Sequence, residues 1–376
     1  MSGIYIHIPF CRQACHYCDF HFSTSMKNKG DMVAALAKEL QMRKRESDDE
    51  VVETIYFGGG TPSVLSTEEI NFLIDEVYKN YDVDENPEIT LEANPDDLSS
   101  EKILKLANSK INRLSIGIQS FFDEDLKMMN RAHNADEAQK SLTEATQHFN
   151  NISIDLIYGM PGMTDERWTE NVEMALSFGV PHISSYALTV EPKTALKKLI
   201  AAGKIASPDD DVAQQHFHIL VDILSRNEFV HYELSNFGKE NYFSKNNSAY
   251  WLGKKYLGVG PSAHSYDGNR RSWNIANNIL YLKSIEADTL PSETELLTAT
   301  DRYNEYVMTG LRTIWGISYH RIRQDFGKVM LQYLQRQALK YIDDGLLKVE
   351  KDILTTTKKG KFLTDGIASD LFYIVE

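Results

Sequence analysis

The strongest constraint on the fold is a regular alternation of strand-like and helix-like segments in the first half of the sequence. Short apolar or β-branched runs recur at 4–8, 54–57, 88–93, 113–118, 152–158 and 183–190. Amphipathic patterns with the helical repeat predict helices at 32–44, 67–81, 101–108, 135–149 and 166–178. Ser66 and Asn134 stand where helix N-caps are expected. This succession predicts parallel strands joined by right-handed crossovers.

Six β/α units in fewer than 200 residues favour a partial β/α barrel over a closed one, although an open doubly wound sheet would give the same pattern. The positions of the polar motifs favour the barrel. Each strand is followed directly by a polar or glycine-rich segment: the cysteine cluster, "GGGTPS", "EANPDD", "GIQSFF", "DLIYGMPG" and "LTVEP". Because the carboxyl ends of barrel strands share one rim, these segments predict a single site.

All the cysteines of the chain lie in the first of these segments: Cys11, Cys15 and Cys18. The spacing C-x3-C-x2-C on a loop lets three thiolates face one small inorganic centre. A zinc site would need a fourth ligand, and nearby histidines could supply it: His7, His16 or His21. An iron-sulfur cluster would keep one iron without a protein ligand, open to a substrate or cofactor. The barrel context favours the cluster over zinc.

The overall charge limits the classes of partner. A formal net charge of -14 and a pI of about 5.3 argue against a large nucleic-acid surface. No apolar run is long enough to cross a membrane, and the start of the sequence lacks a signal-peptide pattern. We therefore expect a cytoplasmic protein that binds no nucleic acid and whose membrane contact is at most peripheral.

Taken together, the motifs resemble those of the radical S-adenosylmethionine (SAM) superfamily, including the aromatic Tyr17 before the last cysteine. More narrowly, "YIHIPFC", "YFGGGTPS", "GIQSF", "IDLIYGMPG" and "YELSNF" are similar to oxygen-independent coproporphyrinogen III oxidases and the related HemW-type heme chaperones. The resemblance implies a 4Fe-4S cluster on the three cysteines. It also implies that SAM binds the remaining iron and undergoes reductive cleavage there.

The same resemblance implies a set of SAM-binding residues around the rim: Tyr5, Tyr17, Gly59, Gly60, Thr61, Glu92, Gln119, Arg131, Asp155 and Ala187. Successive glycines let the backbone approach a ligand and donate N–H groups, although they would also suit an ordinary turn. Glu92 and Asp155 interrupt apolar strands, where an unpartnered carboxylate is costly. A structural ion pair with Arg113 or Arg131 is the alternative explanation for these acids, and a plain core position is the alternative for Tyr5.

The pattern divides the chain into three expected domains: a radical SAM partial barrel over 1–200, an α+β extension covering the active site over 201–295, and a winged-helix-like domain over 296–376. In the extension we expect a helix to about residue 226, a strand over 229–237 and an aromatic-rich segment over 245–266. That segment suits a wall over a flat aromatic ligand, or a loop-rich part packed on the barrel.

The last part of the chain predicts helices near 299–313, 318–326 and 330–344, followed by two short strands. We interpret this winged-helix-like pattern as a lid or partner-docking module rather than a DNA reader, because the chain is acidic.

Two functions from different classes remain open, so the sequence leaves undecided whether the protein is an enzyme. One is a coproporphyrinogen III oxidase that attacks the propionate side chains to give protoporphyrinogen IX. The other is a chaperone that binds heme, or another tetrapyrrole, and delivers it to acceptor proteins. Phe20 stands where the oxidases have a fourth cysteine, which favours the chaperone.

One departure concerns the heme ligand. Heme chaperones of this branch tend to carry a His-Asn-x-x-Tyr-Trp element, and here Asn246 in "NNSAYW" takes the place of the histidine. Asparagine is a poor iron ligand, so heme would need another axial group or none. His264 and His231 are the candidates.

Overall fold

The centre of the molecule is a run of six parallel strands in chain order. In the computed structural model, which describes residues 3–47 and 50–374, these strands are β1 (Gly3–Ile8), β2 (Val52–Gly59), β3 (Val83–Ala93), β4 (Arg113–Gln119), β5 (Ile152–Tyr158) and β6 (His182–Ala187). All six lie where the sequence predicts strands. The sixth ends earlier than expected, at Ala187, whose alignment with Tyr158 is the last pair of the β5–β6 ladder.

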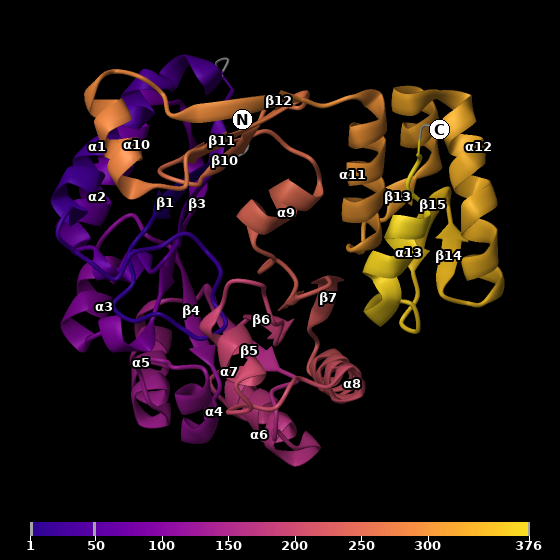
Figure 1. Cartoon of the computed structure of the whole chain (residues 1–376), viewed down its shortest axis with the longest axis horizontal. Helices are drawn as coiled ribbons and strands as arrows, with labels where there is room; N and C mark the ends of the chain where they lie inside the picture. The colour runs from indigo at the N-terminus through magenta and orange to yellow at the C-terminus, as the bar shows by residue number, and fades with distance from the viewer. Residues whose placement is uncertain (1–2, 48–49, 375–376) are drawn as a thin grey trace.

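Helices on the outer face connect these strands (Figure 1). They are α1 (Lys29–Met42), α2 (Thr67–Asn80), α3 (Ser100–Ala107), α4 (Asp123–Met128), α5 (Ala135–His148) and α6 (Asp165–Ser177), with short 3-10 turns η1 (Lys44–Ser47), η2 (Pro62–Val64) and η3 (Pro95–Asp97). Ser66 and Asn134 cap α2 and α5 with complete capping boxes, as predicted. The sequence analysis did not predict the short helix α4.

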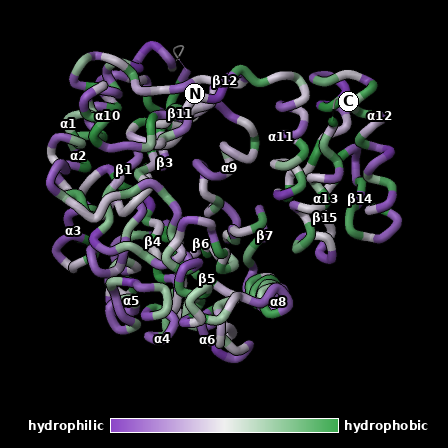
Figure 2. The backbone as a smooth tube through the Cα atoms, in the orientation of Figure 1, coloured by the Kyte–Doolittle hydropathy of each residue, from purple (hydrophilic) through white to green (hydrophobic). Residues whose placement is uncertain are grey.

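Alternation along the strands separates the core from the inner face of the barrel. Ile4, Ile6 and Ile8 on β1 are fully buried under the helices, whereas Tyr5 and His7 point to the other face. Figure 2 shows hydrophobic segments along the strands and mostly hydrophilic ones on the outer helix α5. The polar inner face is therefore available for a site.

The segment after the sixth strand returns to both edges of the sheet. It contains α7 (Ala195–Ala201), α8 (Asp210–Arg226), β7 (Val230–Glu233), β8 (Asn236–Gly238), α9 (Lys245–Trp251), β9 (Tyr256–Val259), β10 (His264–Tyr266), β11 (Arg270–Asn274), α10 (Asn278–Glu286) and β12 (Ser292–Leu296). β8 pairs with β6, and β9 pairs with β1. Among the described residues the sheet has twelve strands in the order β12-β11-β10-β9-β1-β2-β3-β4-β5-β6-β8-β7, so it stays open. The prediction of a partial barrel is confirmed.

The prediction of a single strand over 229–237 is wrong. The segment is a hairpin, β7 and β8, because the buried Glu233 carboxylate accepts hydrogen bonds from the Ser235 N–H and the Asn236 side-chain amide and so fixes a turn.

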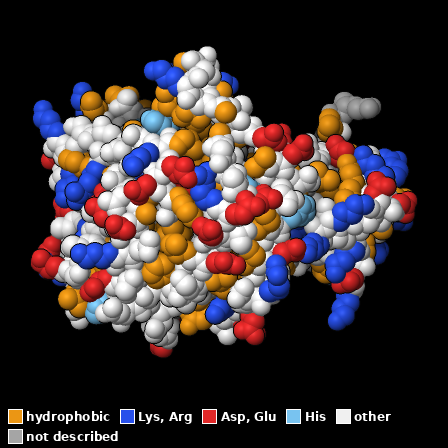
Figure 3. Space-filling model, turned by 90° about the horizontal axis from the view of Figure 1, so that it is seen from below, with side chains coloured by type: hydrophobic (Ala, Val, Ile, Leu, Met, Phe, Trp, Pro, Cys, Tyr) orange, Lys and Arg blue, Asp and Glu red, His pale blue; other side chains and the backbone are white. Residues whose placement is uncertain are grey.

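The C-terminal part has a hydrophobic core of its own. It consists of α11 (Ala299–Leu311), β13 (Ile317–Ser318), α12 (Tyr319–Asp343), β14 (Leu347–Glu350), β15 (Ile353–Thr356), η4 (Lys361–Leu363) and α13 (Thr364–Asp370). A non-helical φ of 87° at Gly327 breaks α12 between the two helices predicted there. The two short strands form the expected hairpin, and β13 adds a third strand. Figure 3 shows this part as a separate lobe that carries many Lys and Arg side chains.

Within the described part of the chain, no helix combines the length and apolar character that crossing a bilayer requires. The domain boundaries at 200 and 295 stay predictions.

Candidate functional site

The site begins at the cysteine loop, residues 9–24, which follows β1 at the rim of the barrel. Backbone hydrogen bonds close the loop at its base, from the Cys11 N–H to the Ser23 carbonyl at 3.1 Å and from the Ser23 N–H to the Pro9 carbonyl at 2.9 Å. The middle of the loop is attached to other elements through His16, whose N–H donates to Met129 and whose carbonyl accepts from Leu196. The three cysteines are free thiols held in one fixed loop.

A chain of hydrogen bonds links two of the cysteine side chains across the rim. Thr61 Oγ1 donates to Cys11 Sγ at 3.3 Å, and Asn94 Nδ2 donates to Thr61 Oγ1 at 3.4 Å. Arg131 continues the chain, with Nη2 donating to Asn94 Oδ1 at 2.7 Å and Nη1 donating to Cys15 Sγ at 3.3 Å. Two sulfurs thus face donors that stabilise a thiolate, as a metal-binding cysteine requires.

Burial and mutual proximity act against ionisation of the free thiols. Burial raises the pKa of Cys11 and of Cys18 to about 11, and the neighbouring cysteines raise it further. Burial also raises the pKa of Tyr17, and its next contributors are Arg131, Cys15 and Cys18. The predicted aromatic residue therefore lies beside the thiol cluster.

The three histidines that could complete a zinc site each have a hydrogen-bond partner. Both ring nitrogens of His7 have partners, Nε2 at 3.0 Å from the His21 carbonyl and Nδ1 at 3.3 Å from Tyr5 Oη. His16 Nδ1 lies 2.8 Å from the Met128 carbonyl, and His21 Nε2 lies 2.7 Å from Asn278 Oδ1. Among the described residues, no three His, Cys, Asp or Glu side chains converge as ligands of a single metal ion. Of the three histidines, His7 is the one with a recorded partner at both ring nitrogens.

Next to the cysteine loop, glycines keep a cradle open on the inner face. A Cβ atom on Gly58 would lie 2.7 Å from Tyr5 Cε2, 3.0 Å from Tyr56 Cε1 and 3.1 Å from Glu92 Oε1. Tyr5 and Tyr56 stack with ring centroids 6.0 Å apart, and Tyr56 Oη donates to Glu92 Oε1 at 2.8 Å. A side chain at Gly58 would therefore displace the groups that shape the cradle.

The two neighbouring glycines are equally constrained. Gly59 has a φ of 109°, and a Cβ there would lie 2.5 Å from the His7 ring. A Cβ on Gly60 would lie 2.7 Å from the Phe10 carbonyl oxygen. The close approach of backbone to backbone at the rim thus requires glycine.

Two carboxyl groups of the inner face are strained by burial. Burial raises the pKa of Glu92 to about 7 and that of Asp155 to about 6. The positive charge of Arg113 opposes both increases in part. Among the described residues, neither acid forms an ion pair with Arg113 or Arg131 within 4.0 Å. The geometry therefore does not show the alternative of a structural ion pair. Glu92 is instead hydrogen-bonded to Tyr56, and Asp155 to Ser184.

The last two predicted residues lie at strand ends. Gln119 has a φ of 68°, and its Nε2 atom lies 2.8 Å from a Cβ built on Gly117, next to Arg131. Ala187 ends β6 beside Tyr158, and no contact recorded among the described residues joins it to the cysteine loop. The structure thus brings together all the predicted residues of β1 to β5, with Ala187 at the far side of the rim.

Two residues of the site were not predicted from the sequence. Tyr56 buttresses both Tyr5 and Glu92, and Asn94 links Thr61 to Arg131. Tyr56 could have been found because it precedes Gly58 by two positions and so shares its face of the strand. Asn94 lies within the "EANPDD" motif but was not singled out there.

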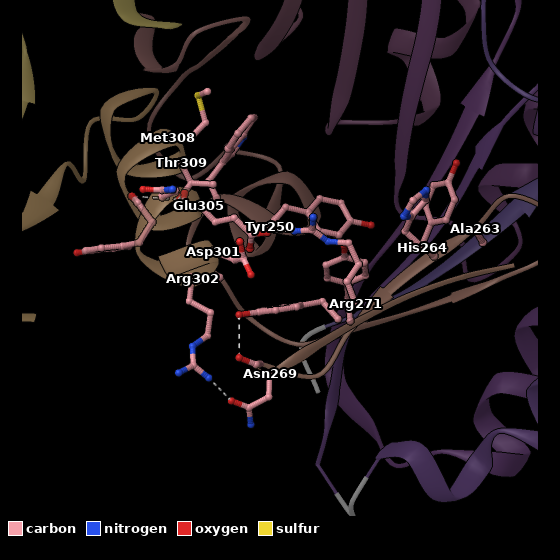
Figure 4. Close-up of a pocket in the computed structure, with 18 of the residues that line it drawn as sticks. Tyr250, Ala263, His264, Asn269, Arg271, Asp301, Arg302, Glu305, Met308 and Thr309 are labelled. Carbon is pink, nitrogen blue, oxygen red and sulfur yellow. Dashed lines mark hydrogen bonds and ion pairs between the residues drawn. The ribbon is translucent and has the colours of Figure 1, made fainter. Parts of the chain in front are cut away.

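The inner face opens into a cavity of about 1340 Å³. Its walls come from the barrel, the cysteine loop, helix α9, strands β9 to β11 and the C-terminal helices, through residues that include Tyr5, Glu92, Phe20, Tyr250, Tyr266, His264 and Glu305. Figure 4 shows His264 and Ala263 on one side and Asp301, Arg302, Glu305, Met308 and Thr309 on the other. The cavity exceeds the roughly 300–1,000 Å³ of a usual small-molecule pocket, so it has room for more than one ligand.

The three residues considered as heme ligands lie in different surroundings. His264 lines the cavity, and no hydrogen bond is recorded for its ring among the described residues. His231 is buried outside the cavity, stacked on Phe237 with Nε2 at 3.0 Å from the Leu234 carbonyl. Asn246 is a buried residue of α9 itself, and its Oδ1 accepts from Thr54 Oγ1 at 3.1 Å.

Comparisons with known proteins identify the class first. A sequence model of the Radical SAM superfamily matches residues 5–175, and one of the HemN C-terminal domain matches residues 297–363. The structure superposes on coproporphyrinogen III oxidase (HemN) from Escherichia coli with a TM-score of 0.85 and 22% identity, over 99% of this chain and 90% of that one, which shows a shared fold. This is a radical SAM protein with a HemN-type C-terminal domain, and radical SAM proteins hold a 4Fe-4S cluster and SAM.

The sequence relatives narrow the class. The heme chaperone HemW of Mycobacterium tuberculosis is 34% identical over 98% of this chain and 94% of the relative, and that of Bacillus subtilis is 33% identical over 98% of both. The chain belongs to the HemW family.

The residues present fit the cluster and cofactor of this superfamily. Free thiols on a fixed loop face hydrogen-bond donors, and a glycine cradle opens beside two carboxyl groups that have no ion pair with Arg113 or Arg131. Within the described part of the chain, the buried Arg131 Nε and Arg113 Nε have no recorded hydrogen-bond acceptor. The sequence prediction of a radical SAM protein of the HemW branch is confirmed.

Proposed function

We propose that this protein is a cytoplasmic heme chaperone, which binds heme in the cavity beside its cluster and passes it to acceptor proteins. The observation that carries the proposal is the continuity of the cavity. One space is lined by Tyr5 and Glu92 of the barrel, by Phe20 after the last cysteine, and by His264. Its full-length relatives named heme chaperone HemW support the same function.

In this proposal Cys11, Cys15 and Cys18 would hold the cluster, whose chemistry when bound would be electron donation to SAM. The backbone of Gly59, Gly60 and Thr61 would contact the amino-acid end of SAM and donate N–H groups to it. The two glycines allow this close approach, since a Cβ atom at either position would clash with its neighbours. Arg131 supplies a fixed positive charge between Cys15 and Asn94.

The remaining predicted residues would surround the rest of SAM. Glu92 and Asp155 would accept hydrogen bonds from its amino group or its ribose hydroxyls. These bonds would stabilise the charged carboxylates, which burial disfavours. Tyr5, Tyr17, Gln119 and Ala187 would complete the enclosure.

Heme would occupy the outer part of the cavity. Aromatic side chains there include Tyr250, Tyr256 and Tyr266, with the rings of Tyr250 and Tyr256 4.4 Å apart. They provide flat apolar contacts for a macrocycle. His264 is the proposed axial ligand: its ring lines the cavity, and partial burial lowers its pKa, which favours the neutral form that binds iron.

The oxidase remains the alternative function. Phe20 replaces the fourth cysteine of the oxidases, and its side chain is 68% exposed in the cavity wall. An apolar ring at this position removes a thiol and adds a contact surface for a macrocycle, which favours binding over oxidation.

The test is hemin titration of the anaerobically reconstituted full-length protein, followed through the Soret band. We expect saturable binding by the wild type and a shifted Soret band with about tenfold weaker binding in His264→Ala. His218→Ala is the matched control, since His218 lines a separate groove between α6 and α8.

A parallel assay supplies coproporphyrinogen III, SAM and a reductant. Conversion at enzymatic rates would show an oxidase and overturn the proposal. Failure to bind heme would overturn it as well, whereas binding without conversion, together with transfer of heme to an apo-cytochrome, would support it.

A further inference from the structure

The cavity has a seam where the hairpin β10–β11 meets helix α11, and two arginines line it from opposite sides (Figure 4). Arg271 on β11 pairs with Glu305 on α11, with Nη2 and Oε1 2.8 Å apart. Arg302 on α11 donates from Nη1 to the neutral Asn269 Oδ1 at 2.7 Å. No ion pair of Arg302 is recorded in the described part of the chain. In the seam, the guanidinium of Arg271 is therefore paired with a carboxylate, whereas that of Arg302 contacts a neutral amide.

The register of the hairpin puts Arg271 on the same face as His264. His264 is aligned with Trp273, and Tyr266 is aligned with Arg271. Because alternate residues of a strand share a face, His264, Tyr266 and Arg271 all face the cavity, and the Cα atoms of His264 and Tyr266 are roughly 7 Å apart. Arg270 has the opposite orientation and lines a different pocket.

We propose that Arg271 and Arg302 bind the carboxylate side chains of the tetrapyrrole, so that the seam selects a ring that carries carboxylates. This inference rests on the proposed function and deepens it. A guanidinium fork matches a carboxylate with two parallel hydrogen bonds. Heme carries its two propionates on one edge, so a ring whose iron faces His264 can direct that edge along the hairpin to the seam.

The acids of the seam determine how the arginines become available. Asp301 accepts hydrogen bonds from the Thr298 N–H and hydroxyl at the start of its own helix. Asp325 pairs with Arg321 at 3.3 Å. Glu305 therefore competes directly with a propionate for Arg271, and the side chains of this pair are 37% and 33% exposed, so exchange is open to a ligand in the cavity.

The experiment compares hemin with hemin dimethyl ester, in which both carboxylates are masked but the ring and iron are unchanged. Full-length reconstituted protein is titrated with each, and binding is followed through the Soret band. We expect the ester to bind about tenfold more weakly to the wild type. Arg271→Ala and Arg302→Ala should each bind hemin more weakly and lose most of the difference between the two ligands. Arg270→Ala, a neighbouring arginine on the opposite face, should retain it.

A further variant separates carboxylate binding from closure of the seam. Glu305→Gln breaks the same ion pair as Arg271→Ala, but it frees the guanidinium. We expect Glu305→Gln to bind hemin at least as tightly as the wild type, and a purely structural ion pair would instead weaken binding in both variants.

Equal affinity of the wild type for hemin and its dimethyl ester would overturn the inference while leaving the proposed function intact. Failure of the wild type to bind either ligand would refute the proposed function itself.

Discussion

The two walls of the cavity are built differently. On the barrel wall, Tyr5, Tyr56 and Glu92 contact one another in a cradle that tolerates no side chain at Gly58. On the opposite wall, Arg271 and Glu305 form a partly exposed ion pair between separate elements. The first wall is preorganised for one ligand. Burial disfavours the charged forms of its carboxyl groups, and a bound ligand that donates hydrogen bonds to them would offset this cost. The second wall can exchange internal partners for those of a ligand.

The largest expected effect that tests this difference between the walls is the pH dependence of stability caused by Glu92. Its pKa is raised from an ordinary value of 4.5 to about 7 in the folded protein, chiefly by burial. Between these two pH values the unfolded chain loses the proton while the folded chain keeps it, so the stability of the cofactor-free protein falls as pH rises. The total penalty is about 3 kcal/mol and is complete above pH 7.

Glu92→Gln removes this penalty. The cofactor-free variant should unfold at higher denaturant concentration than the wild type at pH 8 and at a similar concentration near pH 4, while SAM binding weakens. Urea unfolding at several pH values measures the first effect. A variant that is less stable than the wild type at pH 8 would show that the charged Glu92 stabilises the cofactor-free fold. That result would contradict the proposed difference between the two walls.

The next effect concerns the space above Gly58. Gly58→Ala places a methyl group within 3.1 Å of Tyr5, Tyr56 and Glu92, so these groups must move into the cradle. Overpacking of this kind costs about 2 kcal/mol, equivalent to about thirtyfold weaker SAM binding. Equilibrium dialysis of reconstituted protein with labelled SAM measures it.

Gly30→Ala is the matched control, because a Cβ on Gly30 meets nothing within 4 Å. It should bind SAM as the wild type does. Unchanged SAM affinity in Gly58→Ala would contradict the rigid cradle.

The smallest effect tests helix α9, whose Tyr250 and Trp251 line the cavity while Asn246 lies behind them. Asn246→Ala removes one acceptor for Thr54 Oγ1 and a hydrogen-bond partner of Tyr250, and it should lower the free energy of unfolding by about 1 kcal/mol. The Soret band of the heme complex should not change. A changed band would place Asn246 in the heme site and shift the boundary between the two walls to α9.

The sequence predicted the barrel wall well because its signals are local. Each rim motif follows its strand directly, and parallel strands must bring such motifs to one edge, so Cys11 and Thr61 could be assigned to one site before any geometry was known. Arg131 lies outside these motifs, and its assignment came from the resemblance to the radical SAM family. Tyr56 and Asn94 were missed because their roles depend on contacts with other strands.

The opposite wall could not be assembled in this way. Arg271 and Glu305 lie in separate segments, and their approach depends on how the C-terminal lobe packs against the hairpin β10–β11. The hairpin β7–β8 was misread as one strand because its turn depends on hydrogen bonds of a buried Glu233, an interaction that hydrophobic alternation does not reveal.

The return of the chain to both edges of the sheet has a consequence for biosynthesis. β1 begins at the third residue, yet its outer edge pairs with β9, and Gly3 is aligned with Tyr256. The first strand is therefore flanked on both sides only after synthesis has passed Tyr256, and until then its outer edge is open to other chains.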